Sequence, residues 1–227
     1  MNLRALKPPH ETRTRILDAA EELFMQHGFE ATSMRQLTAK AGANLAAVNY
    51  HFGSKDALIE AVFRRRLDAM NAARIAELER LEKEAGGRPL SPRQIIGAFV
   101  GVSLRMIEDA KSGGRNFIRL LGRTYSDPQK EIRALIGQLY APAMERFKAA
   151  FERALPQMLR EELIWRMHFM FGTLAYTLAA TDTVQLIAGC KPEDRYDARL
   201  LEARLTAFLE AGLLAPQHDA ADVKKAA

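Results

Sequence analysis

Two short helical segments separated by a glycine turn constrain the fold of this chain more than any other feature. Ser33 is a preferred helix N-cap, and Gln36 three residues later completes a capping box. Gly42 stands where a helix-ending glycine belongs, and Asn44 follows almost at once as a second N-cap. Residues 33–52 therefore predict two short helices joined by a tight turn, which is a helix-turn-helix pattern.

The rest of the chain also predicts helices. Apolar residues recur at helical spacing over residues 11–27, and a long helix is expected to start after Ser54 and reach about residue 84. Further helices are expected at about residues 92–110, 127–153, 158–188 and 195–211, with a kink near Pro142. The predicted fold class is all-α: an N-terminal three-helix domain that contains the helix-turn-helix over residues 1–54, a larger helical bundle over residues 55–215, and a polar tail over residues 216–227.

Composition excludes several classes of protein. The chain of 227 residues lacks a run of the ~20 apolar residues that a membrane span needs, so we expect a cytoplasmic protein with no membrane partner. Its single cysteine, Cys190, excludes an intrachain disulfide and a Cys-cluster metal site. No HExxH, P-loop or GxSxG motif is present, so no enzyme activity, cofactor or metal is predicted. The formal charge of +5 is concentrated in the first 66 residues, which favours a polyanion partner for that part.

The second helix of the pattern carries the candidate chemistry. In a helix-turn-helix protein this helix lies in the major groove of DNA. A helical wheel places Leu45, Val48 and Phe52 on its inner face, Ala46, Ala47 and Tyr50 on its outer face, and Asn49 and His51 on its flanks. Small side chains let a helix approach the groove floor, and alanine can contact a thymine methyl group. The alternative is that the aromatic residues form a core cluster and the motif serves packing alone.

Residues 11–60 resemble the N-terminal domain of the TetR family of transcriptional repressors. The resemblance rests on ILDAAEELFMQHGFEATSMRQLTAKAG, on the aromatic run that contains HF, and on the GSKDAL segment. The resemblance places Leu45 in the DNA groove, whereas the helical wheel places it in the core. Most family members have a tyrosine at the position of Asn49, but in this chain the tyrosine is the next residue, Tyr50. The predicted DNA-contacting residues are Ser33, Arg35, Asn44, Leu45, Ala46, Ala47, Asn49, Tyr50, His51 and Lys55.

The body of the chain extends the resemblance. NFIRLLGRTYSD (116–127) and LIWRMHFMFG (163–172) resemble the PsrA-type branch, whose members respond to long-chain fatty acids or their acyl-CoA esters. The family architecture implies a homodimer formed by the helices at 158–188 and 195–211, and hence a palindromic double-stranded DNA operator. The helix at 158–188 is apolar on several faces, which agrees with burial against a partner, although a central helix of a monomeric bundle would look the same.

A small apolar effector is expected in the body. Ligand pockets are mostly apolar with a few polar groups. Candidate lining residues are Phe117, Arg119, Leu120, Leu121, Tyr125, Met144, Phe147, Trp165, Arg166, His168, Phe169 and Tyr176. Two alternatives stay open. In the first, these aromatic residues belong to the hydrophobic core and the arginines lie on the surface. In the second, the protein is a regulator without a small-molecule inducer, controlled by competition or by a protein partner.

Overall fold

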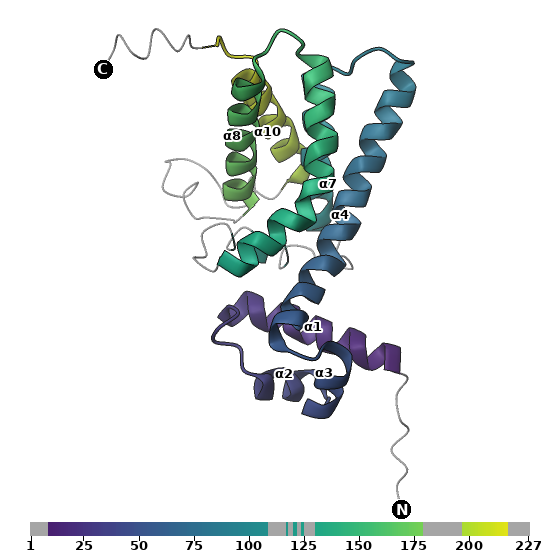
Figure 1. Cartoon of the computed structure of the whole chain (residues 1–227), viewed down its shortest axis with the longest axis vertical. Coiled ribbons are helices and arrows are strands. Elements are labelled where there is room, and N and C mark those ends of the chain that lie inside the picture. The colour runs from purple at the N-terminus through teal and green to yellow at the C-terminus, as the bar shows by residue number, and fades with distance from the viewer. Residues whose placement is uncertain are drawn as a thin grey trace, which may run out of the picture.

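The computed structural model describes residues 9–108, 117, 120, 121, 124, 130–178 and 197–217. These residues form an all-helical structure (Figure 1), which confirms the predicted fold class. The helices described over their length are α1 (Pro9–His27), α2 (Met34–Ala41), α3 (Leu45–Phe52), α4 (Lys55–Ala85), α5 (Pro92–Glu108), α7 (Lys130–Ala154), α8 (Arg160–Leu178) and α10 (Ala198–Leu213).

Helices α1 to α3 form a small unit at one end of the molecule (Figure 1). Phe29 follows the glycine that ends α1 and folds back onto the apolar face of that helix, as the pattern predicts. Its ring centroid lies 5.3 Å from that of Phe24 in α1 and 5.8 Å from that of Phe63 in α4. Because all three rings are buried, they tie α1 to the start of α4 and fix the base on which α2 and α3 sit.

Helix α4 runs from this unit far into the body (Figure 1). Near its start, Leu58 and Val62 are fully buried, and they belong to the same continuous core as α1. Further along, Leu67 and Leu78 are fully buried in the body. The helix is therefore shared by both parts, and the predicted boundary after residue 54 marks the start of this helix.

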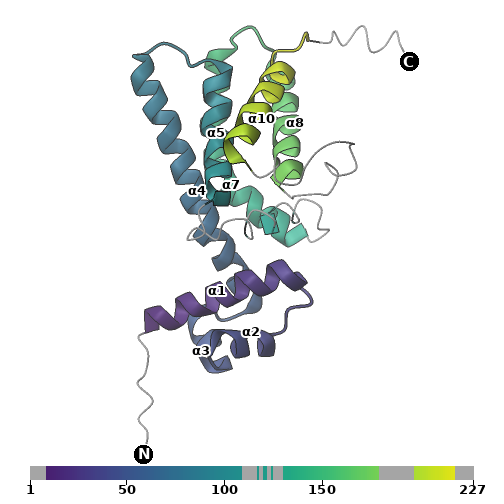
Figure 2. The same cartoon turned by 180° about the vertical axis from the view of Figure 1, so that it is seen from behind.

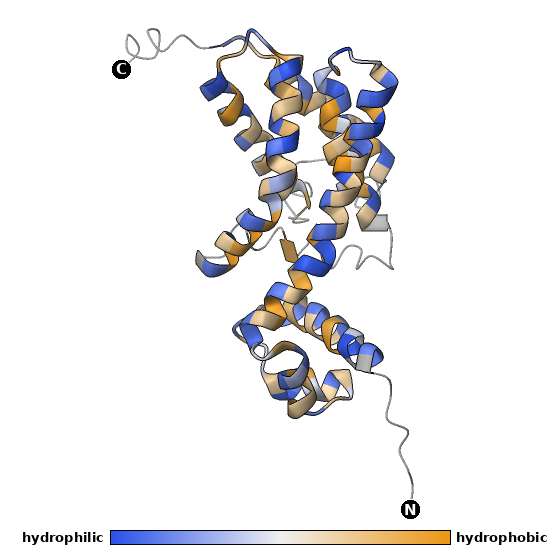
Figure 3. Cartoon of the chain, turned by 45° about the vertical axis from the view of Figure 1, so that its right-hand side comes forward, coloured by the Kyte–Doolittle hydropathy of each residue, from blue (hydrophilic) through white to orange (hydrophobic). Residues whose placement is uncertain are grey.

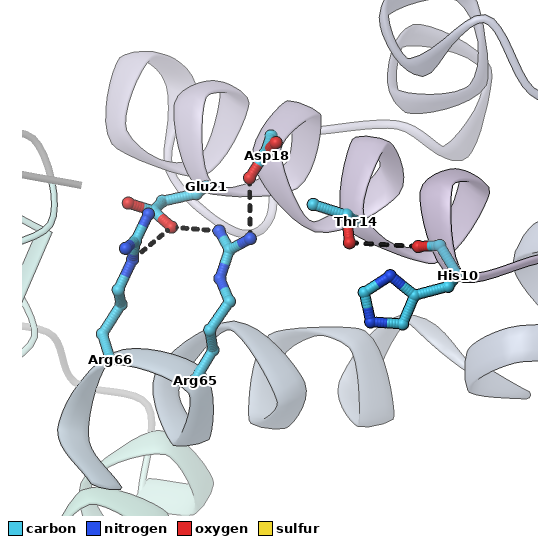
Figure 4. A network of polar contacts seen from close by, with 6 residues as sticks. All are labelled: His10, Thr14, Asp18, Glu21, Arg65 and Arg66. Atoms are coloured by element: carbon cyan, nitrogen blue, oxygen red, sulfur yellow. Dashed lines mark hydrogen bonds and ion pairs between the residues drawn. The ribbon is translucent and has the colours of Figure 1, made fainter. Parts of the chain in front are cut away.

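A network of ion pairs between side chains links α1 to α4, where the N-terminal unit meets the body (Figure 4). Glu21 is buried, and its carboxylate accepts hydrogen bonds from both Arg65 and Arg66, the latter at 3.0 Å. Arg65 also donates to Asp18 at 2.7 Å. A buried carboxylate is stable only when its charge is compensated, so these arginines hold the N-terminal unit against the body.

The body is a bundle in which α5 packs between α4 and α10 (Figure 2). Helix α5 approaches α10 closely at Gly101, where an added Cβ would lie 2.6 Å from a carboxylate oxygen of Glu202. Glycine therefore leaves room for the end of the Glu202 side chain, which a larger residue would displace. At the outer ends of the same helices, Arg93 forms an ion pair of 2.8 Å with Glu210.

Most helix ends lie within two or three residues of the predicted ones. Helix α8 is described only as far as Leu178, and the remainder of the predicted helix at 158–188 lies outside the described residues. Helix α10 runs to Leu213, two residues beyond the predicted end. Helix α7 continues through Pro142 and changes direction along its length in Figure 1, as a proline inside a helix predicts.

Polar and apolar segments alternate along the helices (Figure 3). Within the described part of the chain, no helix is long and apolar enough to span a membrane.

Candidate nucleic-acid interface and body cavity

Helix α3 is held in place by its cap and by one buried face. The Asn44 side chain accepts a hydrogen bond of 2.8 Å from the backbone N–H of Ala47, as its predicted cap role requires. Gly42 ends α2 in the left-handed conformation, with φ of 58°, and this conformation allows the tight turn. Val48 is 1% exposed and Phe52 is partly buried, so these two residues anchor α3 to the unit.

The opposite face of α3 is open. Tyr50 is 83% exposed, and Ala46 and Asn49 are also exposed. Leu45 is 52% exposed, so its wheel position on the inner face is wrong and the groove position implied by the resemblance fits. The physical reason is that Leu45 is the first residue of α3. No preceding turn of the helix lies beside its side chain, and a helical wheel does not represent this helix end. Ala47, predicted to project outward, is partly buried.

His51 lies between two aromatic rings. Its ring centroid is 5.1 Å from that of Tyr50 and 6.2 Å from that of Phe52, and the side chain is partly buried. This packing orients Tyr50 and His51 together at the end of α3.

Helix α2 presents two of the predicted contacts. Arg35 is exposed. Ser33 is also exposed, but its hydroxyl accepts from the Gln36 N–H at 3.2 Å and lies 2.8 Å from the Gln36 side-chain oxygen. The predicted capping box is confirmed, and it fixes the Ser33 side chain at the N-terminus of α2.

Lys55 has an internal partner that the sequence did not reveal. Its ammonium group donates to the backbone carbonyl of Glu30 at 3.3 Å. This bond ties the first turn of α4 to the loop after α1. It offsets the unfavourable position of a cation at a helix N-terminus without an anion.

Arg13 is a cation of this surface that the sequence analysis missed. Its guanidinium lies 5.3 Å from the centroid of the Phe52 ring, and the residue is exposed. The TRTR segment at the start of α1 contains the signal, but only the folded arrangement brings this arginine beside the end of α3.

The body contains a mostly apolar cavity of about 280 Å³. Its walls come from several helices that are distant in sequence. The described lining residues are Arg74, Phe99, Leu121, Thr124, Arg133, Ile136, Gly137, Tyr140, Met144, Phe171, Leu174, Ala175 and Leu178. Of the predicted pocket residues, Leu121 and Met144 line this cavity, whereas Phe117, Leu120 and Phe147 are buried in the surrounding core. Arg119 and Tyr125 lie outside the described residues.

The predicted pocket residues of α8 do not line the cavity. Trp165, Phe169 and Tyr176 are more than half exposed, and His168 is exposed beside them. From this helix Phe171, Leu174, Ala175 and Leu178 line the cavity. Helix α8 turns the other three rings outward, because they lie on its opposite face.

Arg166 is also a structural residue in this chain. It is buried, and it donates to the backbone carbonyls of Leu213, Ala215 and Pro216 at 2.7, 2.6 and 3.1 Å. Orphan carbonyls at a helix C-terminus need donors, and Arg166 supplies them for α10. It does not face the cavity.

An exposed face of small residues on a capped second helix defines the class of helix-turn-helix DNA-binding proteins. Residues 16–62 match the family described as "Bacterial regulatory proteins, tetR family", and residues 97–212 match "Tetracyclin repressor-like, C-terminal domain". The chain belongs to the TetR family of transcriptional regulators.

Relatives agree with this assignment over the N-terminal part. The HTH-type transcriptional repressor AcnR of Corynebacterium glutamicum is 35% identical over 78 residues, which cover 34% of this chain and 39% of AcnR. The HTH-type transcriptional regulator UidR of Escherichia coli is 43% identical over 51 residues, which cover 22% of this chain and 26% of UidR. The aligned segments thus span well under half of these relatives. The relatives and both families are regulators and not enzymes, which confirms that the chain is not an enzyme.

Solved structures share the fold over nearly the whole chain. GusR of Salmonella enterica superposes with a TM-score of 0.60 at 19% identity, covering 94% of this chain and 100% of GusR. The fatty acid degradation regulator FadR of Bacillus halodurans gives 0.62 at 14% identity, covering 89% and 96% of the two chains. At such identities the likeness extends to the fold only.

Proposed function

We propose that this protein is a homodimeric repressor that binds a palindromic operator and is released by a small apolar effector. The observation that carries the proposal is the surface of α3, where Tyr50 is 83% exposed while Val48 is 1% exposed. Such a helix presents an accessible outer face on a fixed base, which is what insertion into the major groove requires. We refer to α3 below as the reading helix.

The contacts to DNA divide into two kinds. Ala46 and Leu45 allow close approach and offer apolar contact to thymine methyl groups, and Asn49 is placed to bond a base edge. Arg35, Arg13 and the Tyr50 hydroxyl lie beside them and suit phosphates, which position the protein but carry no sequence information.

Dimerisation through α8 and α10 is supported by exposed apolar side chains. Trp165 and Phe169 have ring centroids 5.9 Å apart and are 53% and 61% exposed. The same two helices expose further large apolar residues, namely Ile164, Tyr176, Leu200, Phe208 and Leu214. A cluster of this kind on a surface marks a protein interface. We call it the α8/α10 apolar face.

Release by an effector is supported by the cavity and by α4. Arg74 and Lys55 lie on this one helix, with Arg74 in the cavity wall and Lys55 beside the reading helix. At ~1.5 Å per residue a rigid helix spans the ~28 Å between them. A ligand that prefers one placement of α4 therefore changes the spacing of two reading helices, and DNA affinity falls by linkage.

The effector class is proposed as a fatty acid or an acyl-CoA ester, on the resemblance of the body to the PsrA-type branch. The competing function is a regulator without a small-molecule inducer, controlled by competition or by a protein partner. The cavity favours an effector, because mostly apolar cavities lined by a few polar groups are typical of ligand sites.

Selection of duplex DNA from a random-sequence pool tests the DNA-binding part. We expect enriched sequences with two inverted half-sites bound by two copies of the chain, with binding measured by fluorescence anisotropy and stoichiometry by light scattering. Enrichment of no sequence, or binding by a monomer to a single half-site, would overturn the proposal.

A further inference from the structure

A fully buried arginine forms part of the wall of the body cavity. Arg74 is 1% exposed and lines the cavity together with mostly apolar residues and a second cation, the exposed Arg133. Its guanidinium lies 3.7 Å from the centroid of the Phe99 ring and 5.5 Å from that of Tyr140. It is therefore held flat between α5 and α7 by aromatic contacts.

Only neutral groups bond to this guanidinium within the described part of the chain. Nε donates to the Phe99 carbonyl at 3.3 Å, Nη1 to the Asn71 side-chain oxygen at 3.2 Å, and Nη2 to the Ser103 hydroxyl at 2.6 Å. An arginine has five N–H donors, so each terminal nitrogen keeps one more N–H beyond these bonds. Both terminal nitrogens are the pair that a carboxylate engages in a bidentate contact.

The other arginines in similar surroundings differ. Arg166, the other buried arginine among the described residues, forms an ion pair of 2.7 Å with Glu162. Arg65 and Arg66 share Glu21. A buried charge without a counter-charge is costly, so the position of Arg74 in a cavity wall needs an explanation that packing alone does not provide.

We propose that the body cavity binds an apolar monocarboxylic acid whose carboxylate pairs with Arg74. The inference rests on the proposed effector control and names the chemistry of the effector. The apolar walls, including Leu121, Ile136 and Phe171, take the hydrocarbon part of the ligand. The carboxylate supplies the counter-charge that Arg74 does not find among the described residues, and it accepts from the two remaining N–H groups.

The same geometry predicts that the ligand is a free acid and not its CoA thioester. A thioester carbonyl is uncharged and leaves the Arg74 cation uncompensated. The cavity of about 280 Å³ is also slightly smaller than typical ligand pockets, which range over ~300–1,000 Å³. Both facts favour a free acid of moderate chain length over an acyl-CoA ester.

Titration calorimetry of the wild-type protein with a matched ligand series tests whether binding depends on the negative charge of the ligand carboxylate. The series is decanoic acid, methyl decanoate, decan-1-ol and decanoyl-CoA, with octanoic and dodecanoic acids to cover chain length. We expect one of the acids to bind about 10- to 100-fold more tightly than the ester and the alcohol, as a charge-assisted bond predicts. Equal or tighter binding of the ester, the alcohol or the CoA ester would overturn the proposal, and so would binding of none of the acids.

A variant pair tests the residue. Arg74→Gln keeps polar hydrogen bonding without charge, and we expect it to lose the preference for the acid over the alcohol while the affinity for the alcohol changes less than about threefold. Arg80→Gln is the matched control, because it removes an exposed arginine from the same helix. Retention of the acid preference in folded Arg74→Gln would overturn the assignment. If that variant does not fold, the wild-type series decides.

DNA binding is measured in parallel with the selected duplex and without ligand. If the wild type shows no specific DNA binding, the proposed function is wrong, but the ligand-binding result still holds. Specific DNA binding combined with no acid preference defeats the present inference alone.

Discussion

The reading helix α3 and the body helix α8 both expose aromatic rings, but the neighbours of those rings differ. Tyr50 contacts the partly buried His51 ring and otherwise has small and polar residues around it on α3, with Arg35 and Arg13 on the same unit. Trp165 and Phe169 stand in a group that continues onto α10. A single aromatic among small residues and cations suits a polyanion groove, whereas a contiguous apolar face suits a second protein surface. Exposure alone does not identify the partner; the neighbouring residues do.

The largest expected effect comes from placing a charge in the α8/α10 apolar face. Phe169→Glu should convert the dimer to a monomer and weaken operator binding about 100-fold or more, because a charge buried at an interface is left uncompensated. Sedimentation velocity and fluorescence anisotropy on the selected duplex measure the two effects. Arg160→Glu, also exposed at the start of α8, is the control and should leave both unchanged. A dimeric Phe169→Glu would remove α8 from the interface.

The next effect separates the two faces of α3. Val48→Ala should lower the free energy of unfolding by about 1–3 kcal/mol, because it leaves a cavity in the core. Tyr50→Ala should change stability by less than about 0.5 kcal/mol, as expected of an exposed side chain, and reduce operator affinity about tenfold. Urea unfolding and DNA titration of both variants provide the comparison. Equal loss of stability in the two would place Tyr50 in the core and defeat the proposed reading face.

A smaller effect concerns Lys55, which has an internal partner in the free protein. If its ammonium also contacts a phosphate, Lys55→Gln should reduce the salt dependence of operator binding by about one charge. The slope of log affinity against log salt concentration gives this number. Lys83→Gln, in the last turn of the same helix, should not change the slope. An unchanged slope for Lys55→Gln would confine this residue to its bond with the Glu30 carbonyl.

The smallest effect lies in the body, in an ion pair far from both faces. A hydrogen bond from Arg146 lowers the pKa of Glu82 below its ordinary value of 4.5, and Arg153 adds to the effect. A carboxyl group whose pKa is lowered by folding stabilises the fold above its unfolded pKa, and this stabilisation is lost as pH falls through the folded value. Glu82→Gln should therefore cost at most about 1 kcal/mol at neutral pH, since the pair is partly exposed.

Urea unfolding from pH 7 to pH 3 measures this difference. The gap between wild type and Glu82→Gln should shrink below about pH 4.5. Glu152→Gln, whose carboxylate lies 3.9 Å from Arg160, is the control and should show little gap at any pH. A gap that widens on acidification would contradict the assigned role of Arg146.

Local features of the N-terminal unit were predictable because they depend on residues close in sequence. The Ser33 capping box, the Asn44 cap and the left-handed Gly42 each involve bonds between residues at most four positions apart. Leu45 was the exception, because a helical wheel cannot represent the first residue of a helix.

The body was less predictable because its contacts join distant residues. Arg166 was assigned to the pocket, yet it bonds to carbonyls about fifty positions later in the chain. Arg74 was missed, although it occupies the place between Met70 and Leu78 on the apolar seam of α4. An arginine at a seam position is a signal that sequence alone can supply.

The sequence by itself determined that the chain is helical, where its short helices begin and end, and which residues form the helix-turn-helix. These properties follow from caps, turns and periodicity, which act over a few residues. Only the tertiary structure decided which aromatic residues face outward on α8, and which arginine lies in the cavity wall. The physical reason is that burial depends on which helices pack together, and that packing is set by contacts between segments far apart in the chain.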